Sequence, residues 1–302
     1  MQNYLRLFAS LTEDYEERFP TDSKELLKND WWKALQFFFG RAFYQGRRDV
    51  ISEEVERRVI NVLSRYFSDE VIRDSEFDRM KEEGWKKVRQ ELEETIGKGK
   101  MGKKRDIVET IDTMMFVYSL PERNIVNYSV REIRLGKIHM HFRELQHAIE
   151  GVGPKISSLY LRDIVSLFDL GKCLRTEQDY RAVMPVDTWI RKITKSLGFV
   201  RQERPKDNEI IKAIVEKCKE SNISPIRINQ GIWYAGTHSF EACFDRVLKA
   251  LEEMKKGIAQ EASNQLLECI GILEVLISLE EDRDEIIRLK DHISRLSSLV
   301  QS

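Results

Sequence analysis

Hydrophobic residues recur at helical spacing along nearly the whole chain. Between residues 53 and 67, Val55, Val59 and Val62 lie on one helical face, and Ser52 before them is a plausible N-cap. Prolines follow or flank several of the segments with this period. The same period predicts further helices over residues 31–43, 77–96, 106–118 and 208–220. The pattern therefore predicts an all-α protein.

Strand patterns are scarce, and only residues 126–133 have some strand character. The last 60 residues have a different pattern, which predicts two or three long amphipathic helices over residues 240–300. Their apolar stripe has near-heptad spacing that Asp282 interrupts, and it comprises Ile272, Val275, Leu279, Ile286, Leu289, Ile293, Leu296 and Val300. This stripe is either the inner face of a helical hairpin packed on the body or a dimer seam. We expect a body over residues 1–239 and a C-terminal helical extension over residues 240–302.

Two amphipathic helices joined by a tight turn are predicted over residues 138–168. The turn reads Gly151-Val152-Gly153, and Pro154 suits the first position of the second helix, where its missing N–H costs nothing. The two glycines permit positive φ and a close approach of another backbone. The N–H groups at such a helix N-terminus attract a phosphate without reading sequence, although a plain helix turn is the alternative.

Lys155 follows in the first turn of that second helix. The positive end of the helix dipole disfavours a positively charged side chain there, which favours the uncharged amine. An uncharged amine is a nucleophile that can attack a sugar C1′ and form a Schiff base. The alternative is a surface lysine that contacts a phosphate.

Asp187 lies 32 positions further on (187 minus 155), in the run Pro185-Val186-Asp187-Thr188. It precedes an apolar-periodic segment and is predicted to cap a helix. The same carboxylate could stabilise an oxocarbenium-like sugar or help to deprotonate the lysine.

These two runs together resemble the helix-hairpin-helix DNA glycosylases, the endonuclease III-like superfamily. The resemblance implies that Gly151, Val152 and Gly153 grip DNA beside a flipped-out nucleotide. It implies that Asp187 is the catalytic aspartate and that Lys155 is the lysine of the bifunctional glycosylase/lyases. It also implies two helical lobes with the active site between them, one holding the hairpin and the other joining the N-terminal segment to the region after Asp187.

The resemblance extends weakly outward. The segment 42–49 looks like the N-terminal stretch that ends with a glutamine near the DNA, so Gln45 is a candidate to fill the gap left by the flipped base. The segment 229–236 looks like the later helix that precedes a cluster loop in other members. The candidate residues for the base pocket are Trp189, Asn229, Gln230 and Trp233.

The chain departs from the iron–sulfur branch of this superfamily. Its four cysteines, Cys173, Cys218, Cys243 and Cys269, form neither a cluster motif nor a C-x-x-C pair, so no iron–sulfur cluster, zinc or other metal cofactor is expected. The long interval between Lys155 and Asp187 resembles the archaeal 8-oxoguanine glycosylases. The implied partner is double-stranded DNA with an oxidised base, 8-oxoguanine first, bound by a monomer.

Composition changes this picture in one respect. The chain of 302 residues has a net charge of -1, so DNA binding needs a local basic patch. The segment 98–105 is one candidate, as a phosphate-contacting loop or as a solvated flexible one. No signal peptide or membrane span is evident, so we expect a cytoplasmic protein, nucleoid-associated in a prokaryote. The rival interpretations are a non-catalytic hairpin protein that binds DNA and a helical scaffold.

Overall fold

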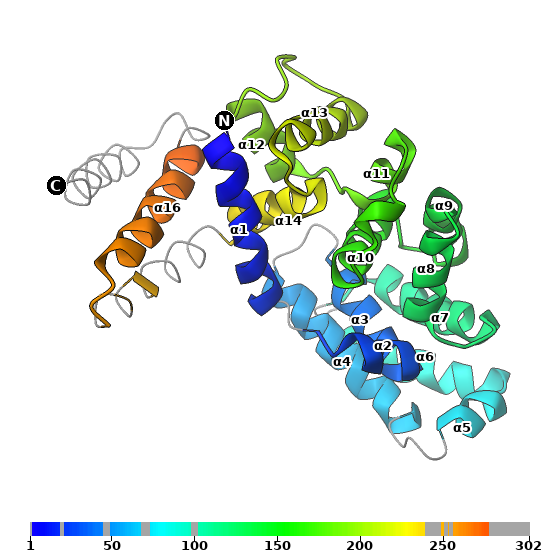
Figure 1. The fold of residues 1–302 in the computed structure, drawn as a ribbon. Helices are drawn as coiled ribbons and strands as arrows, with labels where there is room; N and C mark the ends of the chain where they lie inside the picture. The colour runs from blue at the N-terminus through cyan, green and yellow to red at the C-terminus, as the bar shows by residue number, and fades with distance from the viewer. Residues whose placement is uncertain are drawn as a thin grey trace. The chain divides into compact units, whose positions relative to one another are not determined.

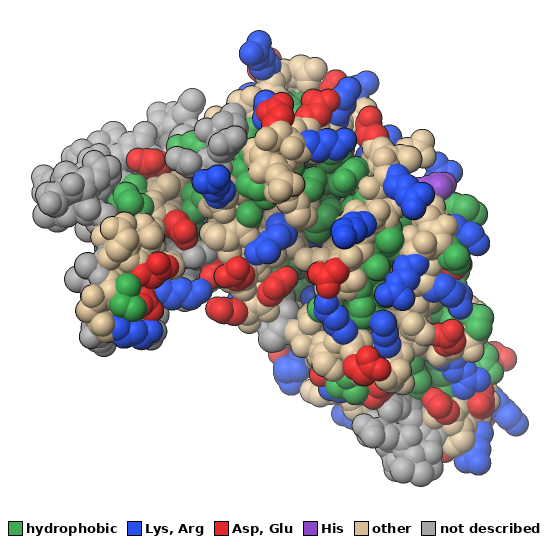
Figure 2. Space-filling view, viewed as in Figure 1, with side chains coloured by type: hydrophobic (Ala, Val, Ile, Leu, Met, Phe, Trp, Pro, Cys, Tyr) green, Lys and Arg blue, Asp and Glu red, His purple; other side chains and the backbone are tan. Residues whose placement is uncertain are grey.

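The structure is a computed structural model of the chain. It describes residues 2–18, 21–44, 49–67, 73–97, 102–238, 249–250, 253 and 256–277. Every regular element in these ranges is a helix, which confirms the predicted all-α class (Figure 1). Lys, Arg, Asp and Glu side chains intermingle over the face in Figure 2, as the charged fraction of 33% leads one to expect.

The chain divides into two compact units. Unit 1 comprises residues 1–20 and 186–302, and unit 2 comprises residues 21–185. The chain therefore leaves unit 1 after Pro20 and returns to it after Pro185. The boundary expected after residue 239 stays a prediction.

Unit 2 holds the predicted hairpin, in helices α9 and α10. Its core is rich in aromatic rings: Trp31 stacks on Phe77 with 5.0 Å between ring centroids, and Phe38 meets Tyr160 edge-on at 4.9 Å. These rings therefore belong to the core rather than to an exposed stacking platform. The elements of unit 2 are α2 (Lys24–Asn29), α3 (Trp31–Ala42), α4 (Asp49–Phe67), α5 (Arg73–Arg79), α6 (Glu82–Ile96), α7 (Lys104–Ser119), α8 (Ile125–Arg134), α9 (Ile138–Ala148), α10 (Pro154–Leu167), the 3-10 helix η1 (Leu170–Cys173) and α11 (Glu177–Val183).

Unit 1 is built on a close contact between its first helix and α14. A Cβ at Gly231 would lie 1.7 Å from the carbonyl oxygen of Phe8, so only glycine fits there. Tyr15 and Trp233 meet edge-on in the same contact, with centroids 5.8 Å apart. The described helices of unit 1 are α1 (Gln2–Arg18), α12 (Thr188–Ser196), α13 (Asp207–Ser221), α14 (Pro225–Thr237) and α16 (Ala259–Ile277).

Three details of the sequence-based prediction are wrong. Residues 126–133 belong to helix α8, whose buried Val126, Val130 and Ile133 have helical spacing despite their β-branched side chains. The single helix expected over 77–96 is broken between α5 and α6. Helix α4 begins at Asp49, so Ser52 lies inside the helix, fully buried, and does not cap it.

Some predictions fall on residues outside the described ranges. They concern Gln45, Cys243, residues 98–101 of the 98–105 loop and the apolar stripe from Leu279 onward. Of that stripe, Ile272 and Val275 lie on α16 and are buried. The end of the predicted 98–105 loop is helical instead, because α7 begins at Lys104.

Candidate functional site

The turn between α9 and α10 depends on one of its two glycines. Gly151 has φ +98°, and a Cβ there would lie 2.7 Å from Glu109 Oε2. Gly153 has φ -87°, an ordinary value, and open space where a Cβ would stand. Within the described chain, Gly151 therefore uses the freedom of glycine, and Gly153 does not.

The turn is anchored beneath by buried side chains and by α7. Ile149 and Val152 are buried, and the N–H of Val152 donates to the carbonyl of Ile149. The N–H of Glu150 donates to Asp112 Oδ2 on α7 at 3.0 Å. Gly151 itself is exposed. The turn is thus fixed on its inner side by these contacts, and its Gly151 faces solvent.

Helix α10 begins without a side-chain cap. Gly153 is its N-cap residue and makes no side-chain cap hydrogen bond, and Pro154 occupies its first turn. Lys155 comes next and is exposed. Among the described residues it has no ion-pair or hydrogen-bond partner for its amine. The predicted start of a second helix at Pro154 is therefore present, and the exposure of Lys155 is what the alternative of a surface lysine leads one to expect.

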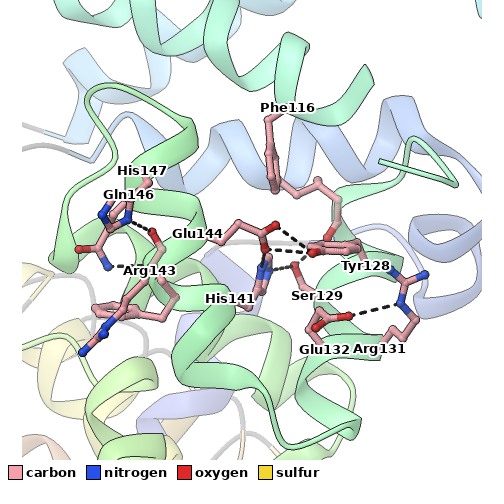
Figure 3. Close-up of polar contacts among 12 residues, drawn as sticks. Phe116, Tyr128, Ser129, Arg131, Glu132, His141, Arg143, Glu144, Gln146 and His147 are labelled. Carbon is pink, nitrogen blue, oxygen red and sulfur yellow. Dashed lines mark hydrogen bonds and ion pairs between the residues drawn. The ribbon is translucent and has the colours of Figure 1, made fainter. Parts of the chain in front are cut away.

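Three polar side chains join the hairpin helices to α8. Ser129 Oγ on α8 lies 2.8 Å from His141 Nε2 on α9 (Figure 3). The same oxygen lies 3.0 Å from Tyr160 Oη on α10. Ser129 also donates to the carbonyl of Ile125 at 2.7 Å, and Tyr160 donates to the same oxygen at 3.1 Å. Burial raises the pKa of Tyr160 well above its ordinary value, so its hydroxyl stays a donor.

Glu144 completes this network on its outer side. His141 Nδ1 donates to Glu144 Oε2 at 3.0 Å, and Tyr128 Oη donates to the same carboxylate at 2.9 and 3.0 Å. The hydrogen bond from His141, followed by that from Tyr128, lowers the pKa of Glu144, although burial opposes the shift. Burial and the hydrogen bond to Glu144 raise the pKa of Tyr128 to about 12.

Ser129, His141 and Glu144 are linked in the sequence hydroxyl, imidazole, carboxylate, as in the catalytic triad of a hydrolase. These three residues cannot act as a catalytic triad. Ser129 is 0% exposed and His141 1%, so no substrate carbonyl can reach the hydroxyl. The network instead fixes the position of α9 against α8 and α10. Sequence reasoning missed it, because its members come from three helices.

Asp187 is the N-cap of α12, as predicted. Its Oδ1 accepts a hydrogen bond from the N–H of Ile190 at 2.9 Å, and the residue is partly exposed. Asp187 belongs to unit 1, whereas Lys155 belongs to unit 2. The catalytic role of each stays a prediction.

The proposed pocket residues lie on α12 and α14 of unit 1. Asn229 and Gln230 are fully buried, and Trp233 packs edge-on against Tyr15. Trp189 is half-buried, and a Cβ at Gly236 would lie 2.4 Å from its ring. The latter two contacts are packing contacts, and the base-reading role of all four residues stays a prediction.

Unit 2 contains a buried ionic cluster that the sequence pattern did not predict. Asp163 on α10 accepts from Arg41 Nε and Arg162 Nε, both at 3.0 Å. Arg41 also stacks on the ring of Phe37, 3.9 Å from its centroid. The partners Arg41 and Asp163 are 122 positions apart, so no local pattern announces the pair.

Glu56 on α4 lies near this cluster and is only partly exposed. A Cβ at Gly40 would lie 3.3 Å from its Oε1. Burial raises the pKa of Glu56 to about 7; the charge of Arg41 opposes the shift and that of Glu53 adds to it. This carboxyl is therefore largely protonated below neutral pH.

No group of three or more His, Cys, Asp or Glu residues in the described part of the chain is arranged to hold a metal ion. Cys218 is buried, which raises the pKa of its thiol to about 12 and keeps it protonated. None of the helices that the structure describes is both long and apolar enough to span a bilayer.

Comparison with known proteins found no match, neither to a family model, nor to a curated protein, nor to a solved structure.

Proposed function

We propose that this protein binds damaged double-stranded DNA through the α9–α10 hairpin and excises a base. One observation carries the proposal: the uncapped N-terminus of α10 follows the exposed Gly151 turn and is followed at once by an exposed lysine, Lys155. The N–H groups and the positive dipole end at the start of a helix suit a phosphate. A lysine beside a bound backbone is placed to react with the sugar.

In the proposed reaction the amine of Lys155 attacks C1′ of the flipped nucleotide. The bond between C1′ and the base breaks, and the base leaves with its electron pair and takes up a proton. Loss of a proton from the amine and opening of the bond between C1′ and O4′ give an imine. Removal of a C2′ proton then expels the 3′ phosphate and nicks the strand. Asp187 is proposed to stabilise the positive charge at the sugar.

The proposed substrate is an oxidised base, with 8-oxoguanine first. This choice rests on the resemblance of the Lys155 and Asp187 runs and their 32-residue interval to the archaeal 8-oxoguanine enzymes. Single-turnover excision from duplexes with 8-oxoguanine, thymine glycol, uracil or guanine tests it. Faster release of thymine glycol than of 8-oxoguanine would contradict the substrate and leave the glycosylase proposal intact.

Borohydride trapping tests the function itself. We expect the wild-type protein to form a covalent adduct with abasic DNA and Lys155→Gln to form none. Lys172→Gln is a matched control, because Lys172 is an exposed lysine on η1 of the same unit. Equal trapping of Lys155→Gln would refute the assignment of the lysine. Duplex binding without trapping by the wild type would favour a non-catalytic hairpin protein.

A further inference from the structure

One face of α9 is basic from the start of the helix to the hairpin turn. The exposed positions Lys137, Met140, Arg143 and His147 follow each other at intervals of three or four residues, so they form one stripe along the helix. These four residues are called the α9 stripe below. The helix ends at Ala148, and the exposed Gly151 of the turn follows three residues later.

Among the residues that the structure describes, the cations of the α9 stripe have no acidic partner. Neither Lys137 nor Arg143 forms an ion pair with any residue that the structure describes. Arg134, at the end of α8, is a third exposed cation without such a partner. By contrast, Arg131 is paired with Glu122 and Glu132. On a chain with net charge -1, unpaired cations in one row are a local positive surface.

The acidic side chain nearest in sequence is turned away from this surface. Figure 3 shows Glu144 and His141 pointing toward Tyr128 and Ser129, while Arg143 and His147 lie on the other side of the close-up. Glu144 is held there by its hydrogen bonds from His141 and Tyr128. At the hairpin end Glu150 is exposed, Asp112 is partly exposed and Glu109 is buried. Figure 2 likewise shows mostly blue side chains over the part of unit 2 formed by α9 to α11.

The helix beneath the α9 stripe is held in place. His147 Nδ1 donates to the carbonyl of Arg143 at 2.6 Å, and the Ser129 network fixes α9 against α8 and α10. A helix that is already fixed adds no cost of backbone ordering when a partner binds. Met140 is 59% exposed in the middle of the row and adds an apolar contact for the same partner.

We infer that the α9 stripe is a second DNA contact, which binds the phosphate backbone in continuation of the hairpin turn. The partner is duplex DNA because the stripe ends at His147, one residue before the end of α9, and the chain leads from there through the turn to the start of α10, whose dipole end suits a phosphate. From Lys137 to His147 the helix rises about 15 Å, which matches about four steps of a duplex at 3.4 Å each. This inference rests on the proposed function.

The salt dependence of DNA binding tests it. Each phosphate contact adds about 0.9 to the slope of log affinity against log salt. The variant Lys137→Gln/Arg143→Gln should therefore lose about 1.8 of that slope and, near 0.1 M salt, on the order of tenfold or more in affinity. The loss should be equal for lesion and undamaged duplexes, because phosphate contacts carry no sequence information.

The matched control is Lys87→Gln/Arg89→Gln on α6. These are also two exposed cations without ion-pair partners in the described chain, but their helix carries five glutamates. The control should keep the wild-type slope. An unchanged slope in the α9 variant, or a loss confined to lesion duplexes, would overturn the inference alone. A wild-type protein that binds no duplex at low salt would overturn the proposed function as well.

Discussion

The contact between α1 and α14 and the junction of α8, α9 and α10 are specified in different ways. In the first, Gly231 lets two backbones approach until nothing larger than hydrogen fits. In the second, Ser129 Oγ lies within hydrogen-bond distance of His141 Nε2 and Tyr160 Oη, so the placement of polar groups decides the fit. A contact set by shape should fail abruptly when volume is added. A contact set by hydrogen bonds should fail by smaller, separable steps.

The largest effect is expected in the contact set by shape. Gly231→Ala should lower the free energy of unfolding by about 3 kcal/mol, because its methyl group meets the backbone oxygen of Phe8. Urea unfolding measures the loss. Gly271→Ala is the control, since a Cβ there would meet only Leu7 Cδ2, at 3.1 Å, a flexible side-chain end. A Gly231→Ala protein as stable as the control would contradict the argument.

Glu56 adds the effect of charge to a packing contact. Its carboxyl lies next to Gly40, and the pKa of that carboxyl is raised. Its pKa of about 7 in the folded protein exceeds the ordinary 4.5, so the folded state holds more protons between these values. The contribution of Glu56 is therefore fully present below about pH 4.5 and is lost as pH rises through 7. With allowance for partial exposure, the loss is at most about 3 kcal/mol.

The variant Glu56→Gln separates this contribution from other titrating groups. Its neutral amide should make the variant more stable than wild type at pH 8, while the difference shrinks at pH 5. Urea midpoints at the two pH values measure this. Parallel pH profiles for the two proteins would show that Glu56 ionises as freely in the folded state as in the unfolded one.

The junction of α8, α9 and α10 should respond more mildly. Tyr160→Phe keeps the ring and removes the hydroxyl that contacts Ser129 Oγ and the carbonyl of Ile125. We expect a loss of about 1 to 2 kcal/mol in the free energy of unfolding. Tyr118→Phe serves as the control, because Tyr118 is 44% exposed. Indistinguishable losses for the two variants would mean that the buried network does not stabilise the hairpin.

The smallest effect on stability is expected at Asp187, which contributes one local hydrogen bond. Asp187→Ala should cost about 1 kcal/mol, and Asp187→Asn only a few tenths, because asparagine is also a good N-cap. If the carboxylate is catalytic, both variants should lose base excision by about 100-fold or more while DNA binding persists. Wild-type excision by Asp187→Asn would reduce the residue to a helix cap.

Local chemistry made the hairpin and the cap predictable. Glycine, proline and lysine in fixed order specify the start of α10, and Asp187 before an apolar period specifies that of α12. The same local reasoning erred for Val126–Ile133, where β-branched residues suggested a strand although their spacing of four and three was already helical. It also missed the end of α5, where neither proline nor glycine marks the break after Arg79.

Long-range chemistry was beyond the sequence. No sequence pattern near His141 predicts its contact with Ser129, and none near Arg41 predicts its ion pair with Asp163. The sequence predicts a basic surface in the glycine-rich segment 98–105, because its lysines and its arginine lie close together in sequence. The charges of the α9 stripe are three or four residues apart, so they stand out only once the exposed face of the helix is known.

The order of the chain has a consequence for synthesis on the ribosome. Unit 2 is one continuous segment, whereas unit 1 needs both ends of the chain. The hydrogen bond from Thr12 Oγ1 to the carbonyl of Arg227, at 3.0 Å, joins residues 215 positions apart. At usual synthesis rates α1 waits about 10 to 40 s for α14 after it has emerged. During that time its apolar face has no partner from its own unit, so the nascent chain should be a substrate for chaperones while unit 2 is already able to fold.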